Sequence, residues 1–305
     1  MSKSKVQIFF EYLLARSLVA FFGLLPLRVS MRAGEKLAGL SYHLGGRLRR
    51  TGRRNLELAF PDLTMSGRDL LLRGCFENLG RLLGVFSHFK QANQQILKQL
   101  IEVQGLEHLD AAGATGRGVI LFTGHIGAWE LSSFGLSVFG RPLSFLVRRL
   151  DNPKVESLID RWRTARGNRT IDKRSAAREI LRILQRGGTA GILVDLNTQE
   201  HEAIFVDFFG IKAATTFVVA KLALRTNSLV LPVFAPWQRD TKTFLLKIDP
   251  PLNIARSGDE PEDVRRLTQA LTSVVEDYVR RYPEQWLWIH RRWKTRPPGE
   301  PEIYQ

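Results

Sequence analysis

Cysteine is almost absent from this sequence of 305 residues, and several widespread functional motifs are missing altogether. The single cysteine, Cys75, cannot form a disulfide within the chain, which fits a reducing, cytoplasm-facing location. We expect Cys75 to be a buried apolar residue of a helix, not a nucleophile. The sequence lacks a phosphate-binding P-loop, a dinucleotide fingerprint, a zinc-protease helix and the G-x-S-x-G elbow of serine acyl-enzymes. It therefore predicts no metal and no bound cofactor.

Acidic residues are scarce relative to basic ones. The chain has 45 Lys and Arg against 30 Asp and Glu, a formal net charge of +15. Such a surface attracts polyanions, which include nucleic acid, anionic lipid headgroups and acidic carrier proteins. Charge alone does not choose among these partners, and a solvated basic surface without a specific partner stays an alternative.

A long uncharged hydrophobic run is also lacking, although residues 6–27 come close. This stretch is rich in Phe and Leu, but Glu11 and Arg16 interrupt it, so that only residues 17–27 are uncharged. A clean transmembrane helix needs about 20 apolar residues. The segment therefore predicts membrane attachment, either as a tilted span or as an interfacial helix. A core helix of a soluble domain is the alternative.

From residue 105 onward, short apolar runs alternate with helical patterns. This alternation predicts an α/β domain with a mixed, largely parallel central sheet flanked by helices, preceded by an N-terminal apolar helix. Before it, we expect helices over 31–48 and 66–89. Within it, we expect strands over 118–123, 143–147, 189–194, 229–234 and 243–248, and helices over 126–138, 153–166, 176–186, 216–225 and 262–281.

The segment GHIGAWE, residues 124–130, is the sharpest candidate for chemistry. His125 directly follows an expected strand, and Glu130 lies within the helix after it. Residues five apart on a regular helix point about 140° apart, so the pair can meet only if His125 lies in the preceding turn. Gly124 and Gly127 favour such a turn. The spacing predicts that His125 takes a proton from a hydroxyl group while Glu130 stabilises the imidazolium.

Several sequence blocks together resemble the bacterial lipid A late acyltransferases, also called lauroyl/myristoyl acyltransferases. The His-x4-acid motif is shared with the wider glycerolipid and lysophospholipid acyltransferases, but the order of the blocks is more specific. The resemblance covers residues 5 to 298. The blocks are GHIGAWE (124–130), VRRLDNP (147–153), VDLN (194–197), VDFFG (206–210) and WLWIHRRWKTRP (286–297).

The resemblance implies an enzyme of the cell inner membrane whose catalytic domain faces the cytoplasm. It implies acyl transfer from an acyl carrier protein, or from acyl-CoA, to a hydroxyl group of a lipid A precursor or related glycolipid. His125 becomes the general base and Glu130 its partner, while Arg148 and Asp195 fall on a family arginine and aspartate. The sequence departs slightly from the family pattern, because Asn197 and Thr198 follow where relatives often have a Gln directly after the aspartate.

The residues support parts of this interpretation independently. Arg148 and Arg149 follow an expected strand and suit phosphate recognition, since a guanidinium presents paired donors. Asp195 also follows a strand and is expected to orient a polar ligand group or Arg148. The predicted organisation is an anchoring helix over 1–30 and an acyltransferase domain over 31–305. The membrane surface is a partner, and nucleic acid is not expected.

Two blocks have apolar alternatives. The Phe208–Phe209 pair is expected either to line an acyl groove or to be core. The Trp-rich tail, 286–297, is expected either to dock on a membrane or to pack as a terminal segment.

Two rival functions stay open at this point. The first changes only the acceptor, to another glycolipid or a lysophospholipid. The second is a non-catalytic, membrane-tethered basic protein that binds anionic lipid or nucleic acid.

Overall fold

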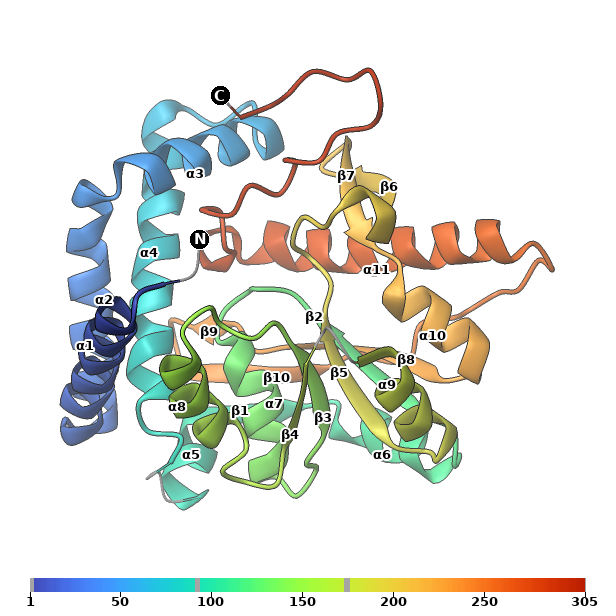
Figure 1. Ribbon diagram of the computed structural model, residues 1–305, viewed down its shortest axis with the longest axis horizontal. Coiled ribbons are helices and arrows are strands. Elements are labelled where there is room, and N and C mark those ends of the chain that lie inside the picture. Colours follow the sequence, from blue (N-terminus) through green and yellow to red (C-terminus); the bar gives the residue numbers. More distant parts are fainter. Residues whose placement is uncertain (1–2, 91–93, 173–175, 305) are drawn as a thin grey trace.

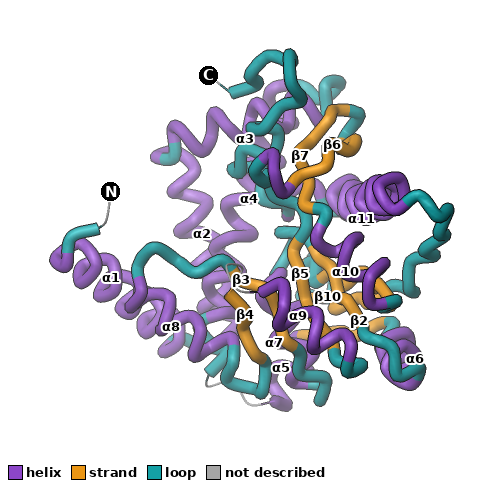
Figure 2. Tube along the Cα trace, turned by 45° about the vertical axis from the view of Figure 1, so that its right-hand side comes forward, coloured by secondary structure: helices purple, strands orange, loops and turns teal. Residues whose placement is uncertain are grey.

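The computed structural model describes residues 3–90, 94–172 and 176–304. A layer of N-terminal helices runs along one side of an α/β domain, and the remaining helices pack around the sheet (Figure 1). Figure 2, turned by 45°, shows the same separation of the helical layer from the strands. The predicted fold class, a mixed and mostly parallel sheet flanked by helices with an N-terminal apolar helix, is confirmed.

Four helices make up the N-terminal layer: α1 (Lys5–Leu24), α2 (Leu27–Leu44), α3 (Gly46–Ala59) and α4 (Met65–Phe86). The helix expected over 31–48 instead ends at Leu44, because the Gly45–Gly46 pair favours a break between α2 and α3. Helices α2 and α4 cross with their backbones in contact. A Cβ atom on Gly80 would lie 2.0 Å from the Gly34 carbonyl oxygen, so the crossing requires glycine on both helices.

Helix α1 is long and apolar enough to cross a membrane, and within the described ranges it is the one helix that is. The Ser4 hydroxyl caps its start by accepting from the Gln7 backbone N–H at 3.1 Å. Only 6% of its most apolar stretch is buried. The large apolar side chains that it exposes are Val6, Phe9, Phe10, Leu13, Leu14, Phe21 and Leu24.

The central sheet has the strand order β1-β10-β8-β2-β5-β3-β4, and β9 pairs with β10. Strand β10 runs antiparallel to β8 and β9, while the other pairs are parallel. The bounds are β1 (Ile101–Gln104), β2 (Val119–Thr123), β3 (Ser144–Val147), β4 (Arg169–Asp172), β5 (Thr189–Leu193), β8 (Leu229–Phe234), β9 (Trp237–Gln238) and β10 (Thr243–Ile248).

Strand β2, in the middle of the sheet, divides the core into two halves. Ile120 and Phe122 pack in one cluster, and Leu121 packs in the other, because successive side chains of a strand point to opposite faces. The first cluster includes Val275 of α11, and the second includes Phe134 of α7. The helices of this domain are α5 (Gln94–Leu100), α6 (Leu106–Ala114), α7 (Trp129–Val138), α8 (Pro153–Arg163), α9 (Ala176–Gln185), α10 (Val218–Thr226) and α11 (Glu260–Arg281).

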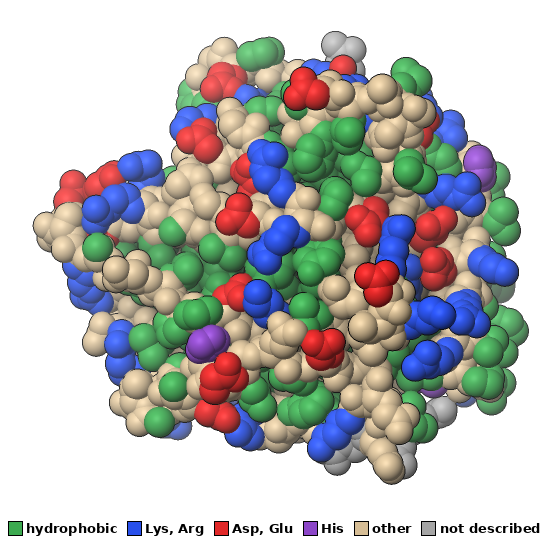
Figure 3. All heavy atoms as spheres, turned by 180° about the vertical axis from the view of Figure 1, so that it is seen from behind, with side chains coloured by type: hydrophobic (Ala, Val, Ile, Leu, Met, Phe, Trp, Pro, Cys, Tyr) green, Lys and Arg blue, Asp and Glu red, His purple; other side chains and the backbone are tan. Residues whose placement is uncertain are grey.

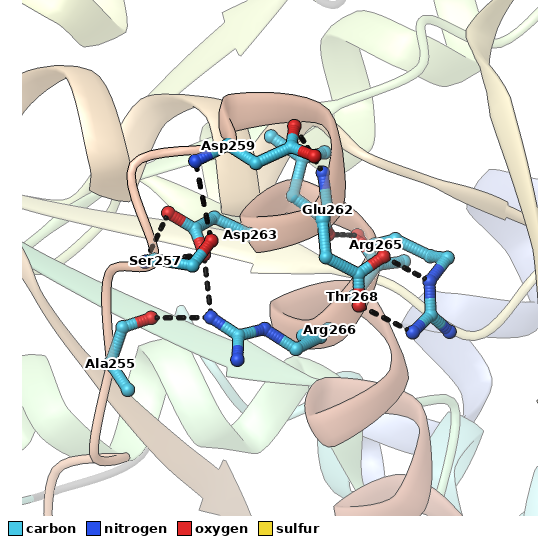
Figure 4. Close-up of polar contacts among 9 residues, drawn as sticks. Ala255, Ser257, Asp259, Glu262, Asp263, Arg265, Arg266 and Thr268 are labelled. Atoms are coloured by element: carbon cyan, nitrogen blue, oxygen red, sulfur yellow. Dashed lines mark hydrogen bonds and ion pairs between the residues drawn. The ribbon is translucent and has the colours of Figure 1, made fainter.

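The start of α11 is fixed by a network of polar contacts (Figure 4). The Asp259 carboxylate caps the helix by accepting from the Glu262 backbone N–H. The buried Asp263 carboxylate accepts from the Ser257 backbone N–H and hydroxyl at 2.9 and 2.8 Å. Arg266 donates to the same carboxylate at 2.6 Å. These contacts anchor the long helix that leads the chain to its C-terminal tail.

The Phe208–Phe209 pair and the tryptophans of the tail belong to the hydrophobic core. Strands β6 (Ala203–Phe208) and β7 (Ile211–Thr216) form a separate hairpin, whose two turn residues, Phe209 and Gly210, both have positive φ. Phe208 is 1% exposed and its ring lies 5.4 Å from the Trp286 ring, so it packs with the tail and does not line a groove. Trp286, Trp288 and Trp293 are fully buried, so the interpretation of their indoles as a membrane-docking surface is wrong.

Candidate active site

His125 lies in the loop between β2 and α7, at the carboxyl end of the central strand. In open α/β sheets, ligands bind at this edge. The loop is held at two points, by a bridge from Ile126 to Trp286 and one from Gly127 to Ala235. The helix expected over 126–138 therefore starts only at Trp129, and His125 precedes it in an irregular turn. This placement of His125 agrees with the turn that the sequence required.

Asp195 holds His125 from the neighbouring strand. Strands β2 and β5 are parallel, with Thr123 opposite Leu193. His125 and Asp195, two residues further along each strand's direction, therefore both fall just beyond the same edge of the sheet. His125 Nδ1 lies 2.8 Å from Asp195 Oδ1, and the His125 backbone N–H donates to Oδ2 at 2.7 Å. Because a carboxylate only accepts hydrogen bonds, Nδ1 carries a proton in this arrangement. The lone pair of the neutral imidazole is then on Nε2.

The Asp195 carboxylate has a third donor and is fully buried. The Trp286 indole N–H donates to Oδ2 at 2.8 Å, and the Asp195 side chain is 0% exposed. Burial acts to raise the pKa of Asp195, but the charge of His125 and the hydrogen bonds from His125 and Trp286 outweigh it and lower the pKa to about 2. Asp195 is therefore a carboxylate at neutral pH. Its oxygens are occupied by protein donors, so the expectation that Asp195 orients a ligand group or Arg148 is wrong.

The structure does not bring Glu130 onto the His125 ring. Instead, Arg163 at the end of α8 donates from Nε to Glu130 Oε2 at 2.9 Å, and its Nη2 is paired with Oε1. The reason is local: the two bridges hold the loop before α7, and Glu130 in the first turn of that helix faces α8. Burial acts to lower the pKa of Arg163, but the Glu130 carboxylate outweighs it and the pKa is raised. Glu130 and Arg163 thus form a charged pair.

One cavity of about 690 Å³ brings these groups together. His125, Glu130, Arg163 and His290 lie along it. Its apolar wall is formed mainly by strands β2, β3 and β5 and by α7, with Leu121, Leu136, Leu143, Phe145, Val147 and Ile192. An apolar cavity with a few convergent polar groups is the usual form of a ligand site. In this cavity, an apolar wall suited to a hydrocarbon chain lies beside His125.

The two arginines predicted to bind substrate have different surroundings. Arg148 lines the cavity, is exposed, and makes no ion pair or hydrogen bond with another described residue. Arg149 does not line the cavity. It lies among three carboxylates, with Glu156 at 3.3 Å, Asp172 at 3.6 Å and Asp160 at 3.9 Å. The structure therefore leaves Arg148 available to a ligand and places Arg149 in an ion-pair cluster.

His290 and Asn197 connect the cavity to the C-terminal tail. The Asn197 backbone N–H donates to His290 Nε2 at 3.1 Å, and Asn197 Oδ1 accepts from the Thr295 backbone N–H at 2.8 Å. Burial lowers the pKa of His290 to about 4, so the ring is neutral at pH 7. Asn197 thus holds the tail in place. Sequence reasoning missed His290 as a lining residue, although it stood in the Trp-rich block.

Few of the described residues suit two other kinds of catalytic site, a nucleophilic cysteine and a metal centre. Cys75 is buried, and burial raises the pKa of its thiol to about 12, so it is not a nucleophile at neutral pH. Over the described ranges, no group of three or more His, Cys, Asp or Glu side chains could hold a metal ion.

Comparison with known proteins decides the family. The sequence model described as "Bacterial lipid A biosynthesis acyltransferase" matches residues 2–295. The chain belongs to this family. The resemblance inferred from the sequence blocks is confirmed, and the chain is a lipid A biosynthesis acyltransferase.

Curated members of the family match over most of their length. The lipid A biosynthesis acyltransferase of Haemophilus influenzae (strain ATCC 51907 / DSM 11121 / KW20 / Rd) is 28% identical, covering 92% of this chain and 87% of the relative. The lipid A biosynthesis lauroyltransferase of Escherichia coli (strain K12) is 29% identical, with 92% and 90% covered. The palmitoleoyltransferase of the same strain is 28% identical, with 96% and 97% covered. With α1, family membership indicates a membrane-anchored enzyme.

Proposed function

We propose that this acyltransferase moves a fatty acyl chain from an acyl carrier protein or CoA thioester to a hydroxyl of a lipid A precursor, with His125 as general base. The observation that carries the proposal is the orientation of the imidazole. Nδ1 is held by the buried Asp195, while the ring lines a cavity with an apolar wall. A base fixed in one tautomer beside a hydrocarbon-binding wall suits transfer between two lipidic substrates.

The chemical step balances without a covalent enzyme intermediate. Nε2 takes the proton of the acceptor hydroxyl as its oxygen attacks the thioester carbonyl carbon, forming the new C–O bond. Asp195 stabilises the imidazolium that results, because its carboxylate is ionised and 2.8 Å from Nδ1. The tetrahedral intermediate then collapses, the C–S bond breaks, and the leaving sulfur takes the proton from the imidazolium. The products are an ester and a free thiol.

The Glu130–Arg163 pair supplies positive charge to the same cavity. The Arg163 side chain is 17% exposed, and Glu130 fixes its guanidinium from one side. A fixed cation beside the reacting carbonyl stabilises the oxyanion without reorganising in the transition state. Glu130 thus assists His125 through Arg163 and not by contact with the ring. Arg148, at the same cavity and without an ion-pair partner among the described residues, binds phosphate of the acceptor or the donor.

The test compares two histidine variants in the purified, full-length enzyme with acyl carrier protein thioester and lipid A precursor. We expect His125→Ala to lower the transfer rate about 10²- to 10⁴-fold, the usual contribution of a general base. The control is His43→Ala, because His43 is an exposed residue of α2 outside the cavity. Full activity of His125→Ala, with normal folding in both variants, would overturn the proposal.

We also propose that the catalytic domain faces the cytoplasm, where acyl carrier protein and CoA thioesters are made. A protease added to intact spheroplasts should then leave the domain intact, while inverted inner-membrane vesicles should expose it. Digestion in spheroplasts would place the domain on the opposite side.

A further inference from the structure

A second cavity, of about 330 Å³, lies between α2, α4 and the turn that joins β9 to β10, and it shares no lining residue with the His125 cavity. Its wall is unusually basic. The cations that line it are Arg28, Arg32, Arg81, Arg239 and Lys242, and the carboxylates are Glu35 and Glu77.

The charges of this cavity do not cancel within the protein. Arg81 pairs with Glu35 at 3.1 Å, and Arg239 lies 3.5 Å from Glu284, outside the lining. The second lining carboxylate, Glu77, already accepts from Arg73. Arg28, Arg32 and Lys242 form no ion pair with any described residue. Three cations therefore converge without anionic partners, which favours a bound anion.

The guanidinium of Arg81 is a buried hydrogen-bond donor in the wall of the cavity. The residue is only 7% exposed, and its guanidinium carbon lies 5.0 Å from the centre of the Trp237 ring. Its Nη1 donates to Asn78 Oδ1 at 3.3 Å, while its buried Nε has no hydrogen-bond partner among the described residues, although a buried donor normally has one. A phosphate in the cavity would place a negative charge beside a cation that burial destabilises.

The position of the cavity indicates what kind of anion reaches it. Helix α2 starts three residues after the end of α1, and Arg28 and Arg32 are one turn apart in its first part. Leu24, at the end of α1, is 86% exposed, and Val29 of α2 is 47% exposed. Basic side chains thus adjoin the apolar surface that enters the membrane. Seen from behind, the molecule gathers Lys and Arg side chains near the edge formed by α1 and α2 (Figure 3).

We propose that this second cavity binds the phosphate headgroup of an anionic membrane phospholipid. Arg32 and Lys242 contact the headgroup from the rim, and Arg81 contacts it from within. Lys242 occupies a left-handed backbone conformation with φ of 55°, at the end of the β9–β10 turn. The site is separate from acyl transfer, so it would exist whether or not His125 is the catalytic base.

The experiment measures binding of short-chain phospholipids to the full-length enzyme in nonionic detergent by isothermal titration calorimetry. We expect dihexanoyl phosphatidylglycerol to bind saturably and dihexanoyl phosphatidylcholine to bind at least tenfold more weakly. The variant R32Q/K242Q removes two rim cations and should weaken phosphatidylglycerol binding by roughly tenfold or more. The matched control, R182Q/R186Q, removes two exposed charges at and just beyond the end of α9, outside the lining of this cavity, and should bind as the wild type does.

Three results would overturn the proposal: equal weakening in both double variants, equal affinity for the two phospholipids, or inorganic phosphate binding as tightly as phosphatidylglycerol. The last result would assign the cavity to free phosphate. His125→Ala should bind phosphatidylglycerol normally, so an error in the catalytic proposal leaves this test intact.

Discussion

Asp195 uses both of its oxygens to position His125. Oδ1 faces Nδ1, while Oδ2 accepts from the His125 backbone and from the Trp286 indole. Burying a carboxylate is costly, and three donors offset that cost. The same three contacts fix where the imidazole lies and which nitrogen carries its proton.

Replacing Asp195 by Asn tests this role. Asn has one acceptor oxygen and cannot serve all three donors, so the ring adopts the other tautomer or loses its position. We expect kcat to fall by about 10³- to 10⁴-fold with little change in KM, as when the carboxylate of a catalytic triad is neutralised. Steady-state kinetics would measure the change, with Asp110→Asn, an exposed carboxylate paired with Arg141, as the control. A loss of only a few fold would contradict the assignment.

Asp195 also contributes to stability in acid. Its pKa is lowered from 3.8 to about 2 on folding, so the unfolded chain binds its proton first as pH falls. The contribution, about 2 kcal/mol, is nearly complete at about pH 5 and is lost as pH falls toward 2. Denaturant unfolding between pH 5 and pH 2 should show less loss of stability in Asp195→Asn than in the wild type. Parallel curves would refute this.

His290 acts in a different pH window. Burial lowers its pKa from 6.5 to about 4, so between these values the unfolded chain holds a proton that the folded protein lacks. Stability therefore falls as pH drops from 6.5 to 4. We expect His290→Gln to flatten this part of the stability curve while leaving the lower window unchanged. An unaltered slope between pH 6.5 and pH 4 would show that His290 does not titrate as its burial implies.

At the scale of elements, the sequence predicted those strands and helices whose residue pattern extends over a few neighbouring residues. Apolar runs located β2 and β5, and the position of His125 after a strand located the loop that carries it. The hairpin β6–β7 was missed, because its strands lack a clear alternation. The partners of His125 and Glu130 depend on contacts between distant elements: Asp195 lies 70 residues from His125, and Arg163 lies 33 residues from Glu130. Spacing within one segment carries no information on such contacts, so proximity in sequence favoured the wrong carboxylate for the imidazole.

The loop between β2 and α7 depends on Gly127. Its φ is +60°, and a Cβ atom there would lie 2.3 Å from the Ala235 carbonyl oxygen. We expect Gly127→Ala to destabilise the enzyme by about 1–3 kcal/mol and to lower kcat by displacing His125. Gly113→Ala is the matched control, because a Cβ at Gly113 meets no atom within 4 Å. Equal melting temperatures for the two variants would argue against a strained loop.

At the scale of the whole molecule, α1 is attached to the α/β domain through α8. The Asn152 side chain, at the start of α8, donates to the Ile8 carbonyl and to Glu11 Oε2, each at 2.9 Å. Glu11 also pairs with Lys3 at 2.7 Å. The acidic residue that interrupts the apolar run therefore binds protein partners, and α8 carries Arg163 at its other end. Helix α8 thus connects α1 to the cavity that contains His125.

The apolar face of α1 should decide membrane attachment. Phe10 and Leu14 are each 63% exposed. We expect F10E/L14E to shift the enzyme from the membrane pellet to the soluble fraction after lysis, because charges oppose entry into the bilayer. Leu70→Glu, at a 72% exposed position of α4, controls for added surface charge and should stay in the pellet. Retention of the double variant in the pellet would mean that another surface anchors the protein.

The indole that completes the Asp195 site comes from residue 286, long after the ribosome has made the imidazole and its carboxylate. Helix α1, by contrast, is made well before residue 286. A nascent chain can thus place α1 at the membrane well before the contacts around Asp195 are complete. We expect the indole contact to form only after residue 286 has been made and its segment has packed beside Asp195.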